Sequence, residues 1–156
     1  MFIKSIYNIF LALLIALFVG FGIDSFYISP KYPEYPNKPI SFESEKEEDI
    51  QKQMEINQEF EEKSKEYREE LKQYNKNVSI IVIGISIVIL VLSLTLLSKI
   101  HIIANGVLLG GVFTTVYGLI RGIMSDSSVF RFIIITIGLV ITLVIGYIKF
   151  IKSRKN

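Results

Sequence analysis

The side chains that could do chemistry in this chain are few, and they lie at the ends of apolar segments. His101 is the single histidine, and Asn105 follows it by four residues, so the two would share one face of a helix. They could form a polar pair at the mouth of a pathway through a membrane, or they could face lipid head groups and a neighbouring helix. We expect the second use, because a histidine near Lys99 at a membrane border commonly faces head groups.

Two arginines flank the turn that follows the third apolar segment. Arg121 and Arg131 could attract an anion, or they could extend toward the head groups and pair with Asp24 and Asp126. We expect the pairing. Tyr117 precedes Arg121 by one helical turn and would support it. The candidate polar or partner-binding residues are therefore Asn105, His101 and Arg121.

Missing residue types exclude several function classes. No Asp or Glu lies inside any of the apolar segments, although transporters coupled to protons or cations usually need one. The chain has no cysteine, which rules out a disulfide framework, a thiolate metal site and a catalytic thiol. It also lacks a phosphate loop, a dinucleotide glycine signature and a zinc-ligand spacing. We predict no enzyme activity, no metal site, no cofactor and no nucleic-acid partner.

Four apolar segments must position these few polar residues. A helix needs about 20 apolar residues to cross a bilayer core, and four segments satisfy this requirement. They cover residues 6–23, 78–97, 102–120 and 130–150. The chain has 156 residues, of which 51% are hydrophobic, so it has room for one compact unit. We predict an all-α integral membrane protein built as a four-transmembrane-helix bundle.

Small residues recur at every fourth position in three of these segments. In a helix they form a slowly winding groove that lets another helix approach closely, which matters because lipid gives no hydrophobic drive for association. The predicted packing residues are Ala12, Ala16, Gly20, Gly106, Gly110, Thr114, Gly118, Gly138, Thr142 and Gly146. The segment 102–120 would be the central helix. In the second segment, Ser79, Ser86 and Ser93 are expected to pack and to bond to the preceding turn of their own helix.

The first 40 residues divide into an anchor and a spacer. Residues 1–24 form the first transmembrane helix and are predicted to be an uncleaved signal anchor, because the apolar run is longer than that of a signal peptide. Residues 25–40 carry a proline at every third position, which favours a polyproline II rod. The rod could be a ligand for an aromatic groove or a rigid spacer, and we favour the spacer.

Residues 41–77 are predicted to form one charged extramembrane helix. The segment 24–77 holds 14 of the 15 acidic residues of the chain. A weak seven-residue seam follows the helix and resembles a coiled coil, although half of it is polar. Its two rows are Ile50, Asn57, Ser64, Leu71 and Val78, and Gln53, Phe60, Tyr67 and Tyr74. The helix is either a solvated charged rod, standing upright or folded onto the surface, or it pairs with a second copy or a partner.

The charged helix is predicted to continue directly into the second transmembrane helix. No glycine or proline breaks the pattern, and Asn75 and Asn77 are the only candidates for an interruption. The remaining residues, 78–156, would hold transmembrane helices 2–4 and a basic tail. A continuous helix would carry its charged half well clear of the membrane.

Charge places both termini in the cytoplasm and residues 25–77 outside it. Lys4 precedes the first segment, Asp24 follows it, and the tail is basic, although the lysines just before Val78 oppose this orientation. We therefore expect a multi-pass protein of the cell (cytoplasmic) membrane. Its predicted role is non-enzymatic: structure, assembly or partner binding through the extracytoplasmic helix. The expected partners are the lipid bilayer and either a second copy of the chain or another membrane or envelope protein.

The alternative function is an oligomeric passive channel or facilitator. Several copies would then arrange their long helices as a vestibule. The side chains expected to face water in that arrangement are Ser86, Asn105, Thr114 and Thr115.

Overall fold

The computed structural model describes residues 2–35, 47–95 and 100–151, and the regular structure within them is helical. In chain order the helices are α1 (Phe2–Phe26), α2 (Glu47–Leu94), α3 (His101–Ile123) and α4 (Ser128–Gly146), followed by a π-helical segment, η1 (Tyr147–Ile151). Four helices are long and apolar enough to cross a membrane. The predicted all-helical class is confirmed, and the chain has the four candidate spans of a multi-pass membrane protein.

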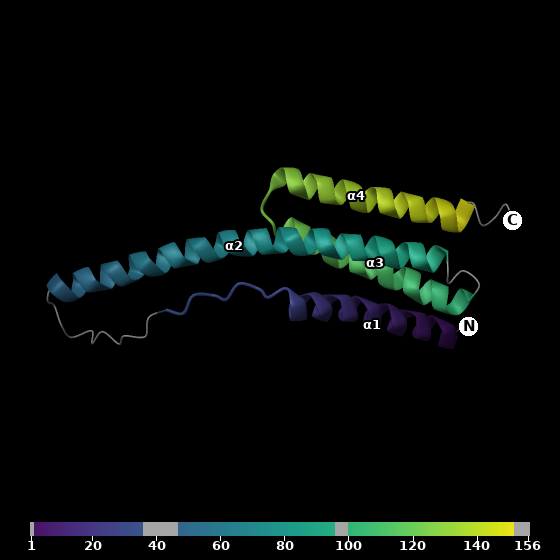
Figure 1. Ribbon diagram of the computed structural model, residues 1–156, viewed down its shortest axis with the longest axis horizontal. Helices are drawn as coiled ribbons and strands as arrows, with labels where there is room; N and C mark the ends of the chain where they lie inside the picture. The colour runs from purple at the N-terminus through teal and green to yellow at the C-terminus, as the bar shows by residue number, and fades with distance from the viewer. Residues whose placement is uncertain (1, 36–46, 96–99, 152–156) are drawn as a thin grey trace.

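Helix α2 is a single helix of 48 residues. At 1.5 Å per residue it is about 72 Å long. Its first half projects well beyond the other helices (Figure 1). Asn75 and Asn77 lie inside the helix and do not interrupt it, as the lack of glycine and proline predicts. Residues 41–46 of the predicted charged helix lie outside the described residues.

Helix α3 lies between α1 and α2 and packs against both. Helices α1 and α3 run in one direction, whereas α2 and α4 run in the opposite direction (Figure 1). A buried cluster joins α1 to α2; it consists of Val19, Ile23, Tyr74, Val78 and Val82. The predicted central position of the third apolar segment therefore agrees with the arrangement of the helices.

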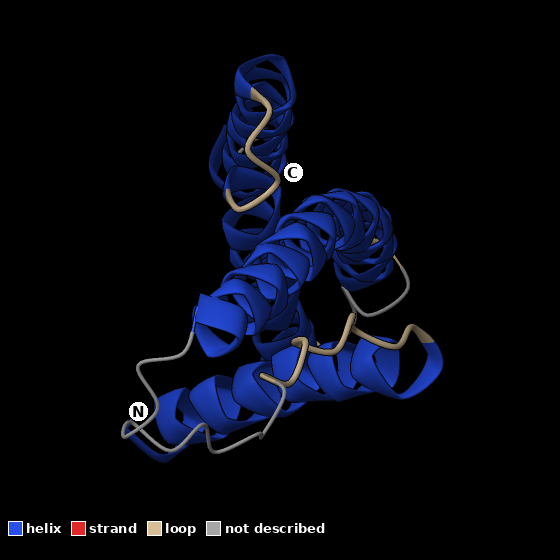
Figure 2. Ribbon diagram, turned by 90° about the vertical axis from the view of Figure 1, so that its left-hand side faces the viewer, coloured by secondary structure: helices blue, strands red, loops and turns tan. Residues whose placement is uncertain are grey.

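Helix α4 stands to one side of this three-helix unit, on the side opposite α1 (Figure 2). In its most apolar stretch 11% of the residues are buried, against 39% in both α2 and α3. Its closest approach to α3 is made by Ile134, which is 3% exposed, and by Gly138. The predicted four-helix bundle therefore packs unevenly, with α4 less buried than α2 and α3. Most of α4 is Ile, Leu and Val, whose large side chains hold the neighbouring helix at a distance.

A tight turn connects α3 to α4. Asp126 adopts a positive φ of 65°, a conformation that Asp tolerates better than most residues. Ser127 then caps α4, because its Oγ accepts a hydrogen bond from the Phe130 backbone N–H at 3.3 Å. The turn lies beside the middle of α2, where the projecting half of that helix begins.

Candidate functional site

Glycines of α3 pack closely on two faces of the helix, one against α1 and one against α2. A Cβ added to Gly106 or Gly110 would lie 2.8 or 2.9 Å from Leu11 or Ile15 of α1. A Cβ added to Gly118 would lie 2.8 Å from Ile83 of α2. Contacts this short have no room for a larger side chain. Glycine at these positions allows the backbones to approach closely, as helix association in lipid requires.

The sequence pattern missed one residue of the second face. Gly111 lies against Leu90, which would be 2.7 Å from an added Cβ, yet Gly111 is not part of the four-residue series. It follows Gly110 by about 100° of helical rotation and therefore faces α2 instead of α1. The signal in the sequence was the pair of adjacent glycines, which indicates that α3 packs closely against two helices.

Two of the predicted packing glycines contact no neighbouring helix. A Cβ on Gly20 or on Gly146 would meet nothing within 4 Å. On α1, close packing involves Ala12, which is fully buried, whereas Ala16 is half-buried. The four-residue pattern therefore extends further along both helices than the contacts do, because α4 and the second half of α1 do not follow α3 closely.

The hydroxyl groups of the small packing residues donate hydrogen bonds to backbone carbonyls of their own helices. Thr114 and Thr142 donate hydrogen bonds to the carbonyls four residues earlier, of Gly110 and Gly138, each at 2.8 Å. Gly138 itself lies against Leu119 of α3, 3.1 Å from an added Cβ. These threonines therefore contribute small volume to the packing without leaving a buried hydroxyl unpaired.

The serines of α2 correct another expectation. Ser86 bonds to its own helix, to the Ile83 carbonyl at 2.8 Å, as predicted. Ser79 and Ser93 instead donate across to α3, to the carbonyls of Gly118 and Ala104, each at 2.7 Å. All three serines are buried. Two interhelical hydrogen bonds therefore fasten α2 to α3 at opposite ends of their contact.

The three candidate polar residues do not form one site. His101 and Asn105 begin α3, and Arg121 ends it, which separates His101 from Arg121 by about 30 Å. Asn105 does not pair with His101; its Oδ1 accepts a hydrogen bond from Lys149 Nζ of η1 at 2.7 Å. His101 is exposed. Of the three candidates, Arg121 is therefore the one that is hydrogen-bonded by more than one side chain.

Arg121 is held by side chains of two helices. Its Nε donates to Tyr117 Oη at 3.1 Å, and its Nη1 donates to Asn75 Oδ1 of α2 at 2.9 Å. The guanidinium carbon also lies 5.4 and 5.8 Å from the ring centroids of Tyr117 and Tyr74. The predicted support from Tyr117 is present, whereas the expected partner Asp24 makes no ion pair with Arg121. Asn75, which is 1% exposed, takes its place.

A groove opens between α1 and α3 beside Arg121. Its volume is about 470 Å³. One wall comes from α1 and the other from the end of α3. The lining residues are Leu13, Ala16, Leu17, Gly20, Phe21, Asp24, Tyr117 and Arg121. We call it the α1–α3 groove. It combines an apolar length with one acidic and one basic residue.

The described part of the proline-rich segment lies along the seam of α2 and does not stand apart as a free rod, whereas residues 36–40 lie outside the described residues. Its residues 27–35, which we call the tyrosine strap, run beside the projecting half of α2. Tyr27 stacks on Tyr74, with ring centroids 5.2 Å apart. Tyr32 meets Tyr67 edge to face at 5.2 Å, and Tyr35 meets Phe60 in the same way at 5.0 Å.

Hydrogen bonds fix the register of the strap on the helix. Asn77 Nδ2 donates to Tyr27 Oη at 2.9 Å. At the other end, Tyr35 Oη donates to Asn57 Oδ1 at 2.8 Å and accepts from Gln53 Nε2 at 3.1 Å. The polar seam residues are thus used to hold the strap. The seam predicted to resemble a coiled coil is covered by the chain itself, at least from Tyr74 to Gln53.

The spacing of the tyrosines explains why the strap fits. Seven helical residues advance about 10.5 Å, and three residues of an extended proline-rich chain advance about 9.3 Å. Tyr32 and Tyr35 are three residues apart, and their partners Tyr67 and Phe60 are seven apart. The sequence did contain this signal for Tyr32 and Tyr35. It did not extend to Tyr27, which is five residues from Tyr32, about 15.5 Å in an extended proline-rich chain.

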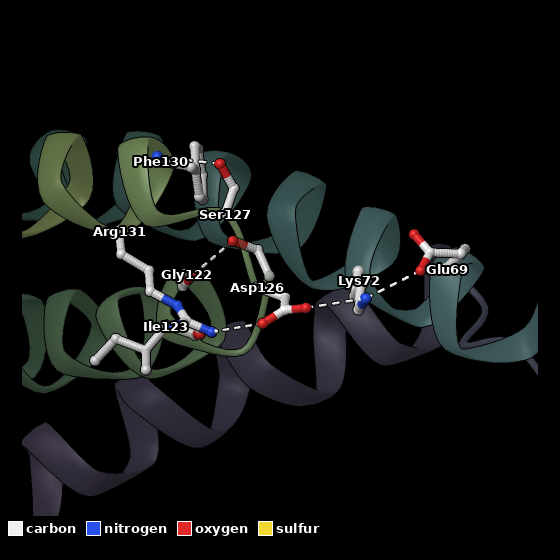
Figure 3. A network of polar contacts seen from close by, with 9 residues as sticks. Glu69, Lys72, Gly122, Ile123, Asp126, Ser127, Phe130 and Arg131 are labelled. Carbon is white, nitrogen blue, oxygen red and sulfur yellow. Dashed lines mark hydrogen bonds and ion pairs between the residues drawn. The ribbon is translucent and has the colours of Figure 1, made fainter. Parts of the chain in front are cut away.

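Charged residues tie the α3–α4 turn to α2 (Figure 3). Lys72 Nζ lies 2.9 Å from both Glu69 Oε1 and Asp126 Oδ2, and Arg131 Nη2 lies 3.2 Å from Asp126 Oδ1. Arg131 Nε also donates to the Ile123 carbonyl at 2.8 Å. The expected pairing of Arg131 with Asp126 is therefore observed. Lys72 is the partner that the sequence did not indicate.

The network shifts the pKa of both of its central groups. The hydrogen bond from Lys72 lowers the pKa of Asp126 below its ordinary value of 3.8. The hydrogen bonds to Asp126 and then to Glu69 raise the pKa of Lys72 above 10.5. Both groups reach solvent, so the network positions the turn more than it stabilises the fold.

The chain matches no protein-family model, no curated protein and no solved structure at a significant level. Within the described residues, no three His, Asp or Glu side chains come together as a group that could hold a metal ion. The interpretation of the site therefore rests on its geometry: a multi-pass helical protein with a braced projecting helix and a groove with charges at one end.

Proposed function

We propose that the chain is a non-enzymatic membrane protein that holds a stiff stalk clear of one membrane surface for assembly or partner contact. The stalk consists of the tyrosine strap and residues 47–77 of α2. The observation that carries this proposal is the bracing of the stalk: three tyrosines cover the seam of an unbroken helix. At 1.5 Å per residue its helix reaches about 45 Å.

The base of the stalk is joined to the membrane helices in two ways. Asn75 binds Arg121 of α3, and Lys72 binds Asp126 of the α3–α4 turn. These contacts fix the direction in which the helix leaves the bundle. A braced rod with a fixed base suits the task of holding a surface at a set distance, because a flexible linker would let that distance vary.

The partner would meet the outer part of the stalk. The strap covers the seam from Tyr74 to Gln53, which leaves the outermost seam residue, Ile50, and the other faces of the helix open to a partner. Two large aliphatic side chains are exposed there, Ile50 at 55% and Met54 at 54%, one helical turn apart. We place the contact around them. A second copy of the chain, or another membrane or envelope protein, would bind at this end, and the orientation of both termini in the cytoplasm remains part of this proposal.

A matched pair of methionines gives the test. A photo-crosslinking residue in place of Met54 should give a discrete protein adduct in native membranes, to be identified by mass spectrometry. The same residue in place of Met124 is the control, because Met124 is equally exposed, at 53%, but lies at the end of α3. Adducts from neither position, or the same adducts from both, would contradict partner binding at the outer end of the stalk.

The channel alternative gains no support from the hydroxyl groups that it needs. Ser86, Thr114 and Thr115 are buried, and each donates to the backbone of its own helix. Conductance of the reconstituted chain in a planar bilayer would be the observation in favour of a channel.

A further inference from the structure

The α1–α3 groove has its two charged residues at one end. Asp24 is the third residue from the end of α1, and Arg121 is the third from the end of α3. Since α1 and α3 run in the same direction, these ends lie together (Figure 1). Charged side chains at the ends of membrane helices lie at the level of the lipid head groups. The rest of the groove then descends into the hydrocarbon layer.

Small residues of α1 keep the groove open. Gly20 lines it, and a Cβ at this position would meet no atom within 4 Å. This differs from Gly106 and Gly110, whose space is filled by side chains of α1. From Leu13 to Asp24 the groove follows α1 for about 16 Å. Its length and its apolar walls suit one hydrocarbon chain that lies along the helix.

The basic residue is prepared for an anion. Tyr117 and Asn75 occupy Nε and Nη1 of Arg121 and so hold the plane of the guanidinium. Arginine has five N–H donors, and Nη2 has no acceptor among the described residues. A guanidinium fixed in this way binds phosphate oxygens well.

Asp24, the acidic residue of the groove, would attract a cationic group of the same ligand. Asp24 is exposed and makes no hydrogen bond or ion pair with the described residues. A purely anionic head group would be attracted by Arg121 but repelled by Asp24. A head group with both a phosphate and an ammonium would satisfy both residues, one charge each.

We propose that the α1–α3 groove binds a phospholipid with a zwitterionic phosphoethanolamine head group. One acyl chain lies against the Gly20 side of α1, the phosphate binds Arg121, and the ammonium binds Asp24. The site shares Arg121 with the base of the stalk, where Asn75 binds it, but it needs neither the outer part of the stalk nor the partner that binds there. It makes one lipid a specific ligand of this chain, distinct from the lipids that merely surround it.

Native mass spectrometry of the full-length chain tests the proposal. The chain is reconstituted with equal amounts of phosphatidylethanolamine and phosphatidylglycerol, extracted in mild detergent, and its retained lipids are counted. The unmodified chain should retain phosphatidylethanolamine in preference. Gly20→Leu should reduce retention about tenfold, because the added side chain begins in open space and extends into the groove. Gly22→Leu is the matched control, since its added Cβ also meets open space but Gly22 does not line the groove.

Two charge variants separate the roles of the ends. Arg121→Gln should lower retention of both lipids about tenfold, because a charge-assisted hydrogen bond to phosphate is lost. Asp24→Asn should lower retention of phosphatidylethanolamine and raise retention of phosphatidylglycerol, and so abolish the preference, because Asp24 attracts an ammonium and repels an anionic head group. Equal retention by Gly20→Leu and Gly22→Leu would overturn the site. Preference of the unmodified chain for phosphatidylglycerol, or no lipid retained, would overturn the assigned ligand.

Discussion

The two halves of α2 are held by different kinds of contact. The half that packs on α3 uses glycines and interhelical serine hydrogen bonds, such as Ser79 to the Gly118 carbonyl. The half in the stalk uses stacked aromatic rings, such as Tyr27 on Tyr74. This difference is the one expected of a helix with one half in lipid and the other in water. In lipid, burial of an apolar ring gains little and close backbone contact matters, whereas in water the burial of rings is the main stabilising effect.

The largest effect should come from larger side chains in the glycine faces. Gly110→Leu with Gly118→Leu should lower the unfolding free energy by at least about 1–3 kcal/mol per site, or prevent folding, because an added Cβ alone would lie 2.9 Å from Ile15 and 2.8 Å from Ile83. Thermal unfolding in detergent measures it. The double variant Gly22→Leu with Gly84→Leu is the control, since both positions face open space. Equal stability of the two double variants would show that close backbone contact does not hold this half.

The next effect concerns the stalk alone. Phe60→Ala removes edge-to-face contacts with both Tyr32 and Tyr35, each worth about 0.5–1.5 kcal/mol. Hydrogen exchange in residues 27–35 should therefore rise, while the exchange of α3 remains as it was. Phe132→Ala, at an exposed position of α4, serves as the control. A rise in α3 exchange after the Phe60 change would show that the two halves of α2 are not held separately.

A smaller effect should distinguish hydrogen bonds between helices from those within one helix. Ser79→Ala and Ser93→Ala each remove a bond from α2 to α3 and should cost about 0.6 kcal/mol. Ser86→Ala is equally buried but loses only a bond within α2, so it should cost less. Equilibrium unfolding of the three variants in mixed micelles checks the order. Equal losses of unfolding free energy in the three variants would show that the bonds between helices stabilise the protein no more than the bond within α2.

The smallest effect is the pH dependence of the α3–α4 turn. The folded pKa of Asp126 is lowered, so its contribution is present above pH 3.8 and is lost as the pH falls through the folded pKa. The folded pKa of Lys72 is raised, so its contribution is complete below pH 10.5 and is lost as the pH rises through the folded pKa. An NMR titration of the turn amides should show them constant between these limits. A transition near neutral pH would contradict the pairing.

Length and composition were enough to predict the helical layout. Four apolar segments of spanning length required four helices, and the glycines from Gly106 to Gly118 indicated that the third would be central. The absence of glycine and proline between Ile40 and Ile83 predicted that α2 would be continuous. Each of these properties depends on local sequence and on lipid as a solvent, and needs no knowledge of the neighbours.

The contacts between distant segments could not be predicted in the same way. A four-residue spacing does not say where a helix diverges from its partner, so Gly20 and Gly146 looked equivalent to Gly110. The seam of α2 left both a solvated rod and a paired helix open, yet from Tyr74 to Gln53 it is covered by the strap of the same chain. Asn75 and Lys72 looked like ordinary polar residues of an exposed helix, because their partners Arg121 and Asp126 come from α3 and the turn after it.

Because α2 is unbroken, the orientation of its outer end is coupled to the orientation of the end that packs on α3. No flexible joint separates the end that lies against α3 from the outer end near Ile50, so a tilt at one end is passed to the other without loss. Over an arm of about 45 Å, a tilt of about 10° displaces the outer end by about 8 Å. In a bilayer, a change in thickness that tilts α2 would therefore move the outer end of the helix by several times more than its inner end.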